Sequence, residues 1–344
     1  MNNFNPGMPA TGITALALLL ASTTATAVEV SVSGQVNRII MSIDNGEESG
    51  LVHADNSNSG TRWRFAGEGD MNEDMQTGLL YETQLQSNPS SDIEADELDS
   101  DGVNGNVGGG DLFSTRYAII WFKGAFGKIT LGQGSGASDG SAEVDNSGTT
   151  VVQYSGSSND LLGSMAFGDS GVTVGAVRSN FDGLGRSDSL RYDAAIEDFT
   201  LAASIGNGDK IEGSVIYAIE GLKVMFGIWD QQDSGDGNSG TAISASWTHD
   251  SGFNFSGALS GDDRDGDPTN TYFKVGYRQG DHAFAVDWSE TRDLGPGDAD
   301  SVSIAWVGQM MQGVELYASY RVESLDVSGA DDISALSGGA RIKF

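Results

Sequence analysis

The chain has 344 residues, no cysteine, and 49 acidic residues against 18 Lys and Arg, so its formal net charge is −31. This charge argues against nucleic acid as a partner, because a polyanion would be repelled. Without cysteine the chain has neither disulfides nor thiolate metal ligands, so backbone pairing and packing must hold the fold together.

The first 27 residues have the pattern of a secretory signal peptide. An apolar run at 13–21 is too short to span a bilayer, and the small residues that follow it end in the A-x-A pattern of Ala25, Thr26 and Ala27. We therefore expect cleavage before Val28 and a mature domain of residues 28–344. No later stretch reaches the roughly 18 consecutive apolar residues of a membrane helix, so any membrane crossing would use strands.

From Val28 onward, apolar and polar residues alternate with a period close to two, which predicts an all-β chain. Phe253, Phe255 and Leu259, for example, are separated by small polar residues. One face of each predicted strand is therefore apolar, and the other is small or charged. The same alternation is clear at 283–289, 301–306 and 314–321.

Short and long connections alternate between these strands. Sixteen up-and-down antiparallel strands result, which is the layout of a transmembrane β-barrel of the outer-membrane type, where closure pairs every backbone group that lipid could not satisfy. Tight turns are predicted at 70–73, 124–126, 197–198, 220–221, 250–252, 280–281 and 310–313, and longer, mostly acidic loops at 44–58, 88–111, 135–186, 207–209, 231–239, 261–268, 293–299 and 325–331.

The long loop 135–186 contains two runs, 161–167 and 172–177, that look strand-like and would raise the count to eighteen. We prefer sixteen strands, because both runs are shorter than a tilted membrane crossing needs. The loop is then one connection between the fifth and sixth strands.

Five segments carry a family resemblance: VSVSGQVNRIIM (30–41), NSNSGTRWRFAGEG (56–69), FGKITLGQGSGASDG (126–140), GRSDSLRYDAAI (185–196) and the final GGARIKF. They resemble the general porins of Gram-negative bacteria, which are trimeric sixteen-stranded channels. The resemblance implies a homotrimer in outer-membrane lipid that passes ions and small hydrophilic solutes through a water-filled pore. It also implies that Phe344 is an assembly signal for the barrel-assembly machinery.

The resemblance further implies that the third external loop, here 135–186, folds into the lumen and narrows the pore opposite a basic wall. Opposed rows of charge would set up a transverse field that orients dipolar solutes. The loop offers Asp139, Glu143 and Asp145. Neighbouring residues of a strand point to opposite faces, so a basic residue next to a lipid-facing one points into the lumen. We expect the following apolar residues to face lipid: Trp63, Phe65, Tyr117, Trp121, Ile129, Leu131, Leu190 and Tyr192. The basic wall would then consist of Arg62, Arg64, Arg116, Lys128 and Arg191.

A simpler interpretation of these arginines is that they only pair with neighbouring carboxylates such as Glu68, Glu82 or Asp193. The two interpretations are compatible. The acidic external loops also predict a preference for cations, which salt should weaken.

Calcium is the one cofactor that the sequence suggests, because two acidic loops space carboxylates with intervening glycine. Neither loop matches a complete EF-hand. The alternative function is therefore a secreted or surface calcium-binding β-protein or adhesin, which has no need of the terminal Phe344 or of the alternating turns. The candidate calcium ligands are Asp99, Asp101, Asp263, Asp265 and Asp267.

No catalytic residues are predicted. The three histidines, His53, His249 and His282, fall in predicted loops or turns, and the sequence has no G-x-S-x-G motif or zinc-spaced histidine pair. We therefore do not expect an enzyme.

Overall fold

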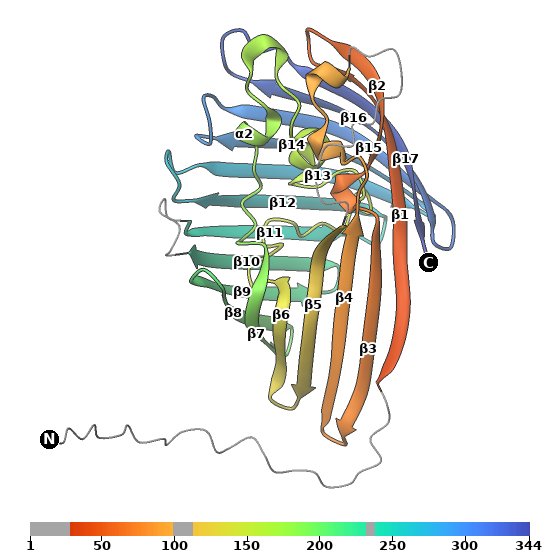
Figure 1. Cartoon of the computed structure of the whole chain (residues 1–344), viewed down its shortest axis with the longest axis vertical. Helices are drawn as coiled ribbons and strands as arrows, with labels where there is room; N and C mark the ends of the chain where they lie inside the picture. Colours follow the sequence, from red (N-terminus) through yellow and green to blue (C-terminus); the bar gives the residue numbers. More distant parts are fainter. Residues whose placement is uncertain (1–27, 99–112, 232–237) are drawn as a thin grey trace, which may run out of the picture.

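The computed structural model describes residues 28–98, 113–231 and 238–344, and within them seventeen strands form one antiparallel sheet (Figure 1). The last strand, β17 (Ile333–Lys343), pairs with the first, β1 (Glu29–Asp44), so the sheet closes into a barrel. The N-terminal half of β1 pairs with β3 (Arg62–Asn72), and its C-terminal half pairs with β2 (Ser49–Asp55). β2 and β3 are therefore two halves of one crossing, and the sixteen crossings predicted from the sequence are confirmed.

The remaining strands follow one another around the barrel in chain order. The predicted signal peptide, 1–27, lies outside the described residues. The strands are β4 (Met75–Leu85), β5 (Phe113–Gly124), β6 (Gly127–Ser135), β7 (Arg186–Ile196), β8 (Phe199–Gly206), β9 (Lys210–Ile219), β10 (Leu222–Gln231), β11 (Gly240–Thr248), β12 (Phe253–Asp262), β13 (Thr269–Gln279), β14 (His282–Arg292), β15 (Ala299–Met311) and β16 (Val314–Leu325). The helical pieces are η1 (Ser57–Ser59), η2 (Ser90–Asp92), η3 (Ala95–Glu97), α1 (Ser157–Leu162), η4 (Gly168–Ser170) and α2 (Val174–Val177).

Tight turns join the strands at one end of the barrel, and longer connections join them at the other, as the alternation predicts. The predicted loop 44–58 is the exception, because β2 lies within it and only 45–48 form the connection between β1 and β2. Val52 and Ala54 of β2 are buried. Apolar and polar residues alternate over only a few positions in β2, between an acidic segment and an Asn-rich segment. The strand is therefore hard to recognise in the sequence. No helix in the described ranges is long and apolar enough to cross a membrane.

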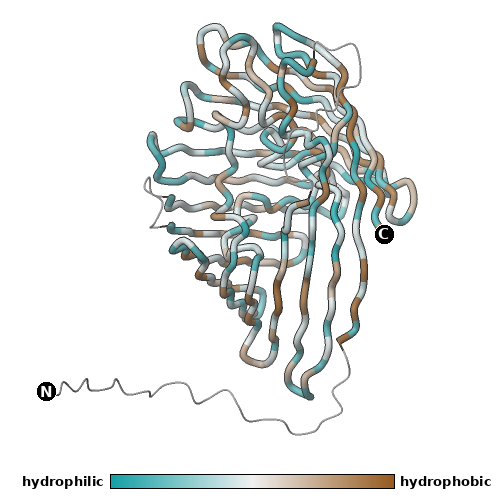
Figure 2. The backbone as a smooth tube through the Cα atoms, in the orientation of Figure 1, coloured by the Kyte–Doolittle hydropathy of each residue, from teal (hydrophilic) through white to brown (hydrophobic). Residues whose placement is uncertain are grey.

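The outward side chains of the strands are apolar, and Figure 2 shows hydrophobic and hydrophilic residues alternating along each strand. Phe226, Val286 and Ile304, on three different strands, are each about half exposed on this face. Aromatic pairs gather near the tight turns, with ring centroids 4.9 Å apart in both Phe199–Tyr217 and Phe253–Tyr277. An apolar band edged by aromatic rings is the outer surface that a bilayer requires.

The connection between β6 and β7 folds into the barrel, where its middle part packs against the inner wall. Leu162, Met165 and Phe167 are fully buried there, together with Ile39 and other inward residues of the wall. The two strand-like runs form the short helices α1 and α2 with a single bridge between Ala166 and Thr173. The alternative of eighteen strands is therefore wrong, because the apolar residues of these runs face the internal core rather than lipid.

Inward serines of the wall bind the backbone of this loop, which satisfies groups that would otherwise be buried without a partner. They lie on β8, β11 and β12. The loop is thus fixed to the wall along much of its length. The bonds run from Ala137 N to Ser204 Oγ (2.8 Å), from Val144 N to Ser244 Oγ (3.1 Å), from Asn146 N to Ser246 Oγ (2.9 Å) and from Ser260 Oγ to Asn180 O (2.6 Å).

Replacing Phe167 with alanine should loosen the loop, because the ring is fully buried in the internal core. We expect the free energy of unfolding to fall by about 3–5 kcal/mol. External protease should then cut the folded variant within 136–185, where the wild type resists. Phe199→Ala on the outer face is the control and should leave the loop resistant. Equal resistance of both variants would contradict the packing described.

Candidate functional site

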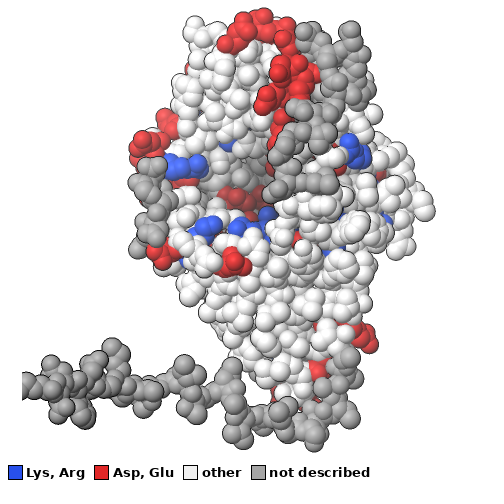
Figure 3. Space-filling view, viewed as in Figure 1, with Lys and Arg blue, Asp and Glu red and all other residues white. Residues whose placement is uncertain are grey.

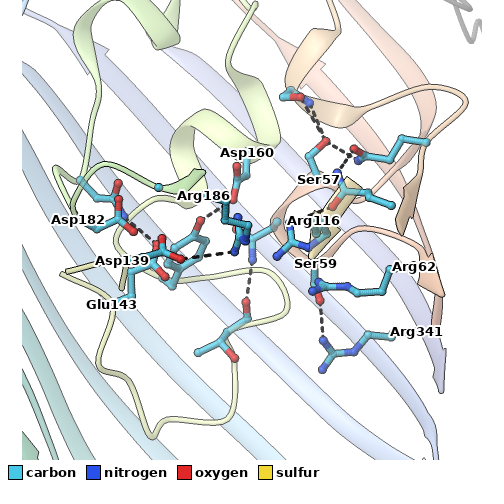
Figure 4. Close-up of a pocket in the computed structure, with 18 residues that line it drawn as sticks. Ser57, Ser59, Arg62, Arg116, Asp139, Glu143, Asp160, Asp182, Arg186 and Arg341 are labelled. Carbon is cyan, nitrogen blue, oxygen red and sulfur yellow. Dashed lines mark hydrogen bonds and ion pairs between the residues drawn. The ribbon is translucent and has the colours of Figure 1, made fainter. Parts of the chain in front are cut away.

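A cavity of about 720 Å³ lies between the inward loop and the wall formed by β3, β4, β5 and β17 (Figure 4). Figure 3 shows a hollow in the barrel with acidic residues inside it and basic residues along its rim. In Figure 4 the acidic side chains come from the loop and face three arginines of the wall, with Arg186 between them. The charged lining residues are Arg62, Arg116, Arg186 and Arg341, and Asp139, Glu143, Asp160 and Asp182.

Arg62 and Arg116 line the cavity, and both also contact Glu82, which is completely buried behind them. Glu82 Oε1 lies 2.8 Å from Arg116 Nε and 3.5 Å from Arg62 Nη1. Arg64 binds the other carboxylate oxygen of Glu82. Three guanidinium groups thus share one carboxylate, so the wall keeps a positive charge even though its arginines are paired.

The other three predicted basic residues do not line the cavity. Arg64 faces a separate hollow beside Trp121. Arg191 pairs with Asp193 at 2.8 Å and donates a hydrogen bond of 2.7 Å to Gly136 O, so it supports the start of the loop. Lys128 lies near the tight turn after β5, with Nζ 5.3 Å from the centroid of the Trp121 ring.

Arg116 points inward for a different reason from the one that alternation predicts. Tyr117 was expected to face lipid, but its hydroxyl lies 2.8 Å from Ser135 Oγ and its ring lies beneath Arg186 of the cavity. Trp121 also faces inward, beneath Lys128. The pairing of β4 with β5 skips Arg116, because a β-bulge inserts one residue there. Two consecutive side chains can then point to the same side of the sheet.

The acidic residues predicted on the loop divide into two groups. Asp139 and Glu143 line the cavity. Asp145 lies behind it, where its carboxylate is 2.7 Å from Lys274 Nζ and both side chains are almost completely buried. Lys274 also donates a hydrogen bond of 2.7 Å to Gln153 O. The structure therefore places Asp145 as an anchor between the loop and β13.

Sequence reasoning missed four charged lining residues: Arg186, Arg341, Asp160 and Asp182. Arg341 could have been found, because Ala340 and Ile342 alternate around it in the last strand. It donates a hydrogen bond of 2.7 Å to Ser59 Oγ. The others depend on how the loop folds, for which the sequence offers no periodic signal.

Three carboxyl groups of the loop have raised pKa values, and burial is the largest cause in each: Glu143, Asp160 and Asp182. Burial, followed by the charges of Asp182 and Asp139, raises the pKa of Glu143 well above its usual range. Burial also raises the pKa of Asp160 to about 6, although the Tyr154 hydroxyl donates a hydrogen bond of 2.5 Å to its carboxylate. These carboxyl groups therefore lose their protons at a higher pH than exposed carboxyl groups do.

A second inward element, the bend at 56–61 between β2 and β3, narrows the cavity from the wall side. Asn58 Nδ2 donates to Thr150 O at 2.7 Å, and Asn56 Nδ2 donates to Val151 O at 2.9 Å, so the bend is tied to the loop across the lumen. Gln35 Nε2 donates to Ser59 O at 2.8 Å and holds the bend from β1. Ser57, Asn58 and Ser59 all line the cavity.

Phe344 closes the seam of the barrel. Its N–H donates to Gly34 O at 3.0 Å, and its carbonyl accepts from Gly34 N at 2.9 Å. The Phe344 ring lies so close over Gly34 that a side chain at this position would collide with it. The role of Phe344 as an assembly signal stays a prediction.

The candidate calcium ligands are not gathered into a site in the part of the chain that is described. Asp99 and Asp101 lie outside it. Asp263 accepts a hydrogen bond of 2.6 Å from Ser239 N. Among residues 28–98, 113–231 and 238–344, no group of three His, Asp or Glu side chains could hold a metal ion. Calcium binding therefore stays a prediction for Asp265 and Asp267 as well.

The model of the Gram-negative porin family matches residues 12–328. The chain belongs to the Gram-negative porin family. It is an outer-membrane diffusion porin, and its strands cross the outer membrane with the apolar face toward lipid. A comparison with curated proteins finds no match.

Solved porin structures share the fold. The anion-selective porin from Comamonas acidovorans is 16% identical, with a TM-score of 0.61 over 92% of this chain and 100% of that one. The outer membrane protein OmpT of Vibrio cholerae in its trimer form is 14% identical, with a TM-score of 0.60 over 93% and 100% of the two chains. A mutant of Rh. blastica porin is 10% identical, with a TM-score of 0.60 over 92% and 100%. At these identities the likeness shows the fold alone.

The different positions of Asp139 and Asp145 predict different effects of neutralising each carboxylate. Asp139→Asn should shift the zero-current potential in a salt gradient toward anions, because Asp139 lines the cavity. Asp145→Asn should leave that potential nearly unchanged but lower the free energy of unfolding by about 3–5 kcal/mol, because it leaves the buried Lys274 charge unpaired. An equal shift of the potential in both variants would show that Asp145 faces the pore.

Proposed function

We propose that ions and small hydrophilic solutes cross the outer membrane through the cavity between the inward loop and the arginine wall. The observation that carries the proposal is the opposition of charges in Figure 4, where loop carboxyls face Arg62, Arg116 and Arg341 across a water-accessible gap. Fixed charges of both signs across a narrow gap orient the water and any dipolar solute within it. Small polar solutes pass such a constriction more readily than long apolar ones, which would have to displace the ordered water.

The loop itself supports this route, because it fills the part of the lumen beside the cavity. Its apolar residues pack against β1 and against the β15–β17 sector, where Ile39, Ala305 and Ile333 belong to the same buried core. A dry core of this kind leaves no room for water. The cavity beside the arginine wall is then the narrowest point on the path, and it sets the size limit of the pore.

The proposed unit in the membrane is a homotrimer. A V. cholerae outer membrane protein of the same fold is described in a trimer form. In this chain Arg38 points outward about midway along β1, between the exposed Val36 and Ile40, and pairs with Asp55 at 2.7 Å. Arginine facing lipid near the middle of the bilayer costs about 2–4 kcal/mol. A neighbouring subunit over this part of the wall would avoid that cost.

We also propose that Phe344 is a signal for assembly of the barrel in the outer membrane. The Phe344 ring is exposed on the outer surface beside Ile342, at the end of an alternating strand. An exposed terminal aromatic residue is accessible to the barrel-assembly machinery before the seam with β1 closes.

Planar-bilayer recordings of the purified protein test the proposed function. We expect stepwise conductance increases, with each inserted unit closing in three equal sublevels under high voltage because each monomer has its own pore. Replacing Arg116 with serine should raise the single-channel conductance for large organic ions by widening the gap, whereas Arg292→Ser on the outer face should not. A protein that inserts without steps would contradict the proposal.

A further inference from the structure

The inward loop leaves the wall and returns to it at one narrow place, which we call the neck, residues 135–138 and 183–186. The last backbone hydrogen bond between its two limbs runs from Gly136 N to Gly185 O at 3.1 Å. Beyond this bond the limbs separate, and Asp139 is the first residue of the outgoing limb that lines the cavity. The neck therefore determines where the charged part of the loop begins.

Two oppositely charged side chains of β9 hold the two limbs of the neck. Lys210 and Glu212 share the inner face of the strand, because Ile211 between them is about half exposed on the outer face. Lys210 Nζ donates a hydrogen bond of 3.1 Å to Leu184 O on the returning limb. Glu212 Oε2 accepts a hydrogen bond of 3.2 Å from Ser138 N on the outgoing limb and a second one from the Ser138 hydroxyl. Each charge thus meets a backbone group of the opposite polarity.

The outgoing limb is also bound from β7 and β8. Arg191 Nη1 of β7 donates a hydrogen bond of 2.7 Å to Gly136 O, and Ser204 Oγ of β8 accepts one of 2.8 Å from Ala137 N. Three consecutive residues of this limb are thus each bound by a side chain from a different strand. The neck lies directly against the wall formed by β7, β8 and β9, so a released neck can move only away from it, into the lumen.

The approach of Glu212 to the neck requires a glycine at position 136. A Cβ atom added to Gly136 would collide with both carboxylate oxygens of Glu212. Gly136 is not among the glycines with a positive φ, so its backbone conformation would accept alanine. The glycine therefore provides room for the carboxylate rather than for a turn.

We propose that Lys210, Glu212 and Arg191 are positioning residues that keep the pore open by holding both limbs of the neck back against β7, β8 and β9. None of the three belongs to the described residues that line the cavity, so they act through the neck and not by contact with a solute. The neck positions Asp139 and Arg186, which lie 3.9 Å apart at its inner end (Figure 4). The inference rests on the proposed function, because it takes the cavity as the route of the solutes.

Single-channel recordings of the purified porin test this inference, because a neck that moves into the lumen reduces the current. Glu212→Ala and Lys210→Met each release one limb. Loss of a hydrogen bond to a charged group should raise the fraction of time spent at reduced conductance levels by about tenfold or more. Glu212→Gln should stay closer to the wild type, because its amide oxygen still accepts from Ser138.

The opposite charges of Lys210 and Glu212 separate positioning from a direct effect on the field in the pore. If the two residues position the neck, both substitutions change the conductance levels in the same direction. If they act only through their charge, the two substitutions move the zero-current potential in a salt gradient in opposite directions and leave the conductance levels unchanged. The second result would overturn the inference.

A pair of substitutions at the contact between Gly136 and Glu212 provides a second test. Gly136→Ala alone should push the neck into the lumen and favour the reduced levels, because the new methyl group collides with the carboxylate. In the Glu212→Ala background the methyl group has room, so the double variant should behave like Glu212→Ala alone. Such non-additivity is expected only for residues in contact.

The matched control is Glu73→Ala, which removes an exposed glutamate from the tight turn between β3 and β4 and should keep the wild-type levels. Wild-type behaviour of Glu212→Ala and Lys210→Met would overturn the inference, as would additive effects in the double variant. Both results presuppose open channels. Absence of conductance steps in the wild type would instead contradict the proposed function, so the two failures are distinguishable.

Discussion

The pore depends on the attachment of the inward loop to one side of the barrel wall. A barrel of sixteen crossings encloses more space than a sieve for small solutes can leave open. The loop fills one side of that space with an apolar core, and buried charges fix its position. Lys274 holds Asp145, and Arg321 of the wall donates to Ser157 of the loop at 2.6 Å. Breaking a buried pair of this kind costs several kcal/mol, because one charge is left without a partner.

This attachment makes the lumen asymmetric. On one side Phe167, Leu162 and Ile39 exclude water, while on the other the arginines of β3, β5 and β17 remain accessible. The charged side can be polar because water fills it, and the dry side can be apolar because the loop covers it. The inward serines between them serve the loop backbone and carry no charge, so they hold the loop without adding to the field in the pore.

Much of the barrel could be predicted from the sequence, because a period of two fixes which side chains face inward. Trp63 and Phe65 turn Arg62 toward the pore, and the alternation of short and long connections gives the number of crossings. Alternation fails where one inserted residue changes the pairing, as at Arg116, and where the strand is short and has polar neighbours, as in β2.

The constriction could be predicted only in part. The resemblance placed Asp139 and Glu143 on the correct loop, but Asp145, only two residues further on, turns away to Lys274. Asp182 approaches Glu143 across 38 residues of irregular chain, and only the tertiary fold brings the two together. Periodicity carries no information about such contacts, because the loop has neither a regular strand nor a long helix.

The central claim is that water fills the lumen beside the arginine wall and is excluded from the space behind the loop. Single cysteine substitutions test it most directly, because the natural chain has no cysteine. Arg116→Cys places a thiol on the open side of the wall, and Ser303→Cys places one behind the loop, where Gln153 covers Ser303 with a hydrogen bond of 2.8 Å. A charged, water-soluble thiol reagent should reduce the current through the Arg116→Cys channel within minutes and leave the Ser303→Cys channel unchanged. Equal block of the two channels would contradict the central claim, because water would then reach both sides of the loop.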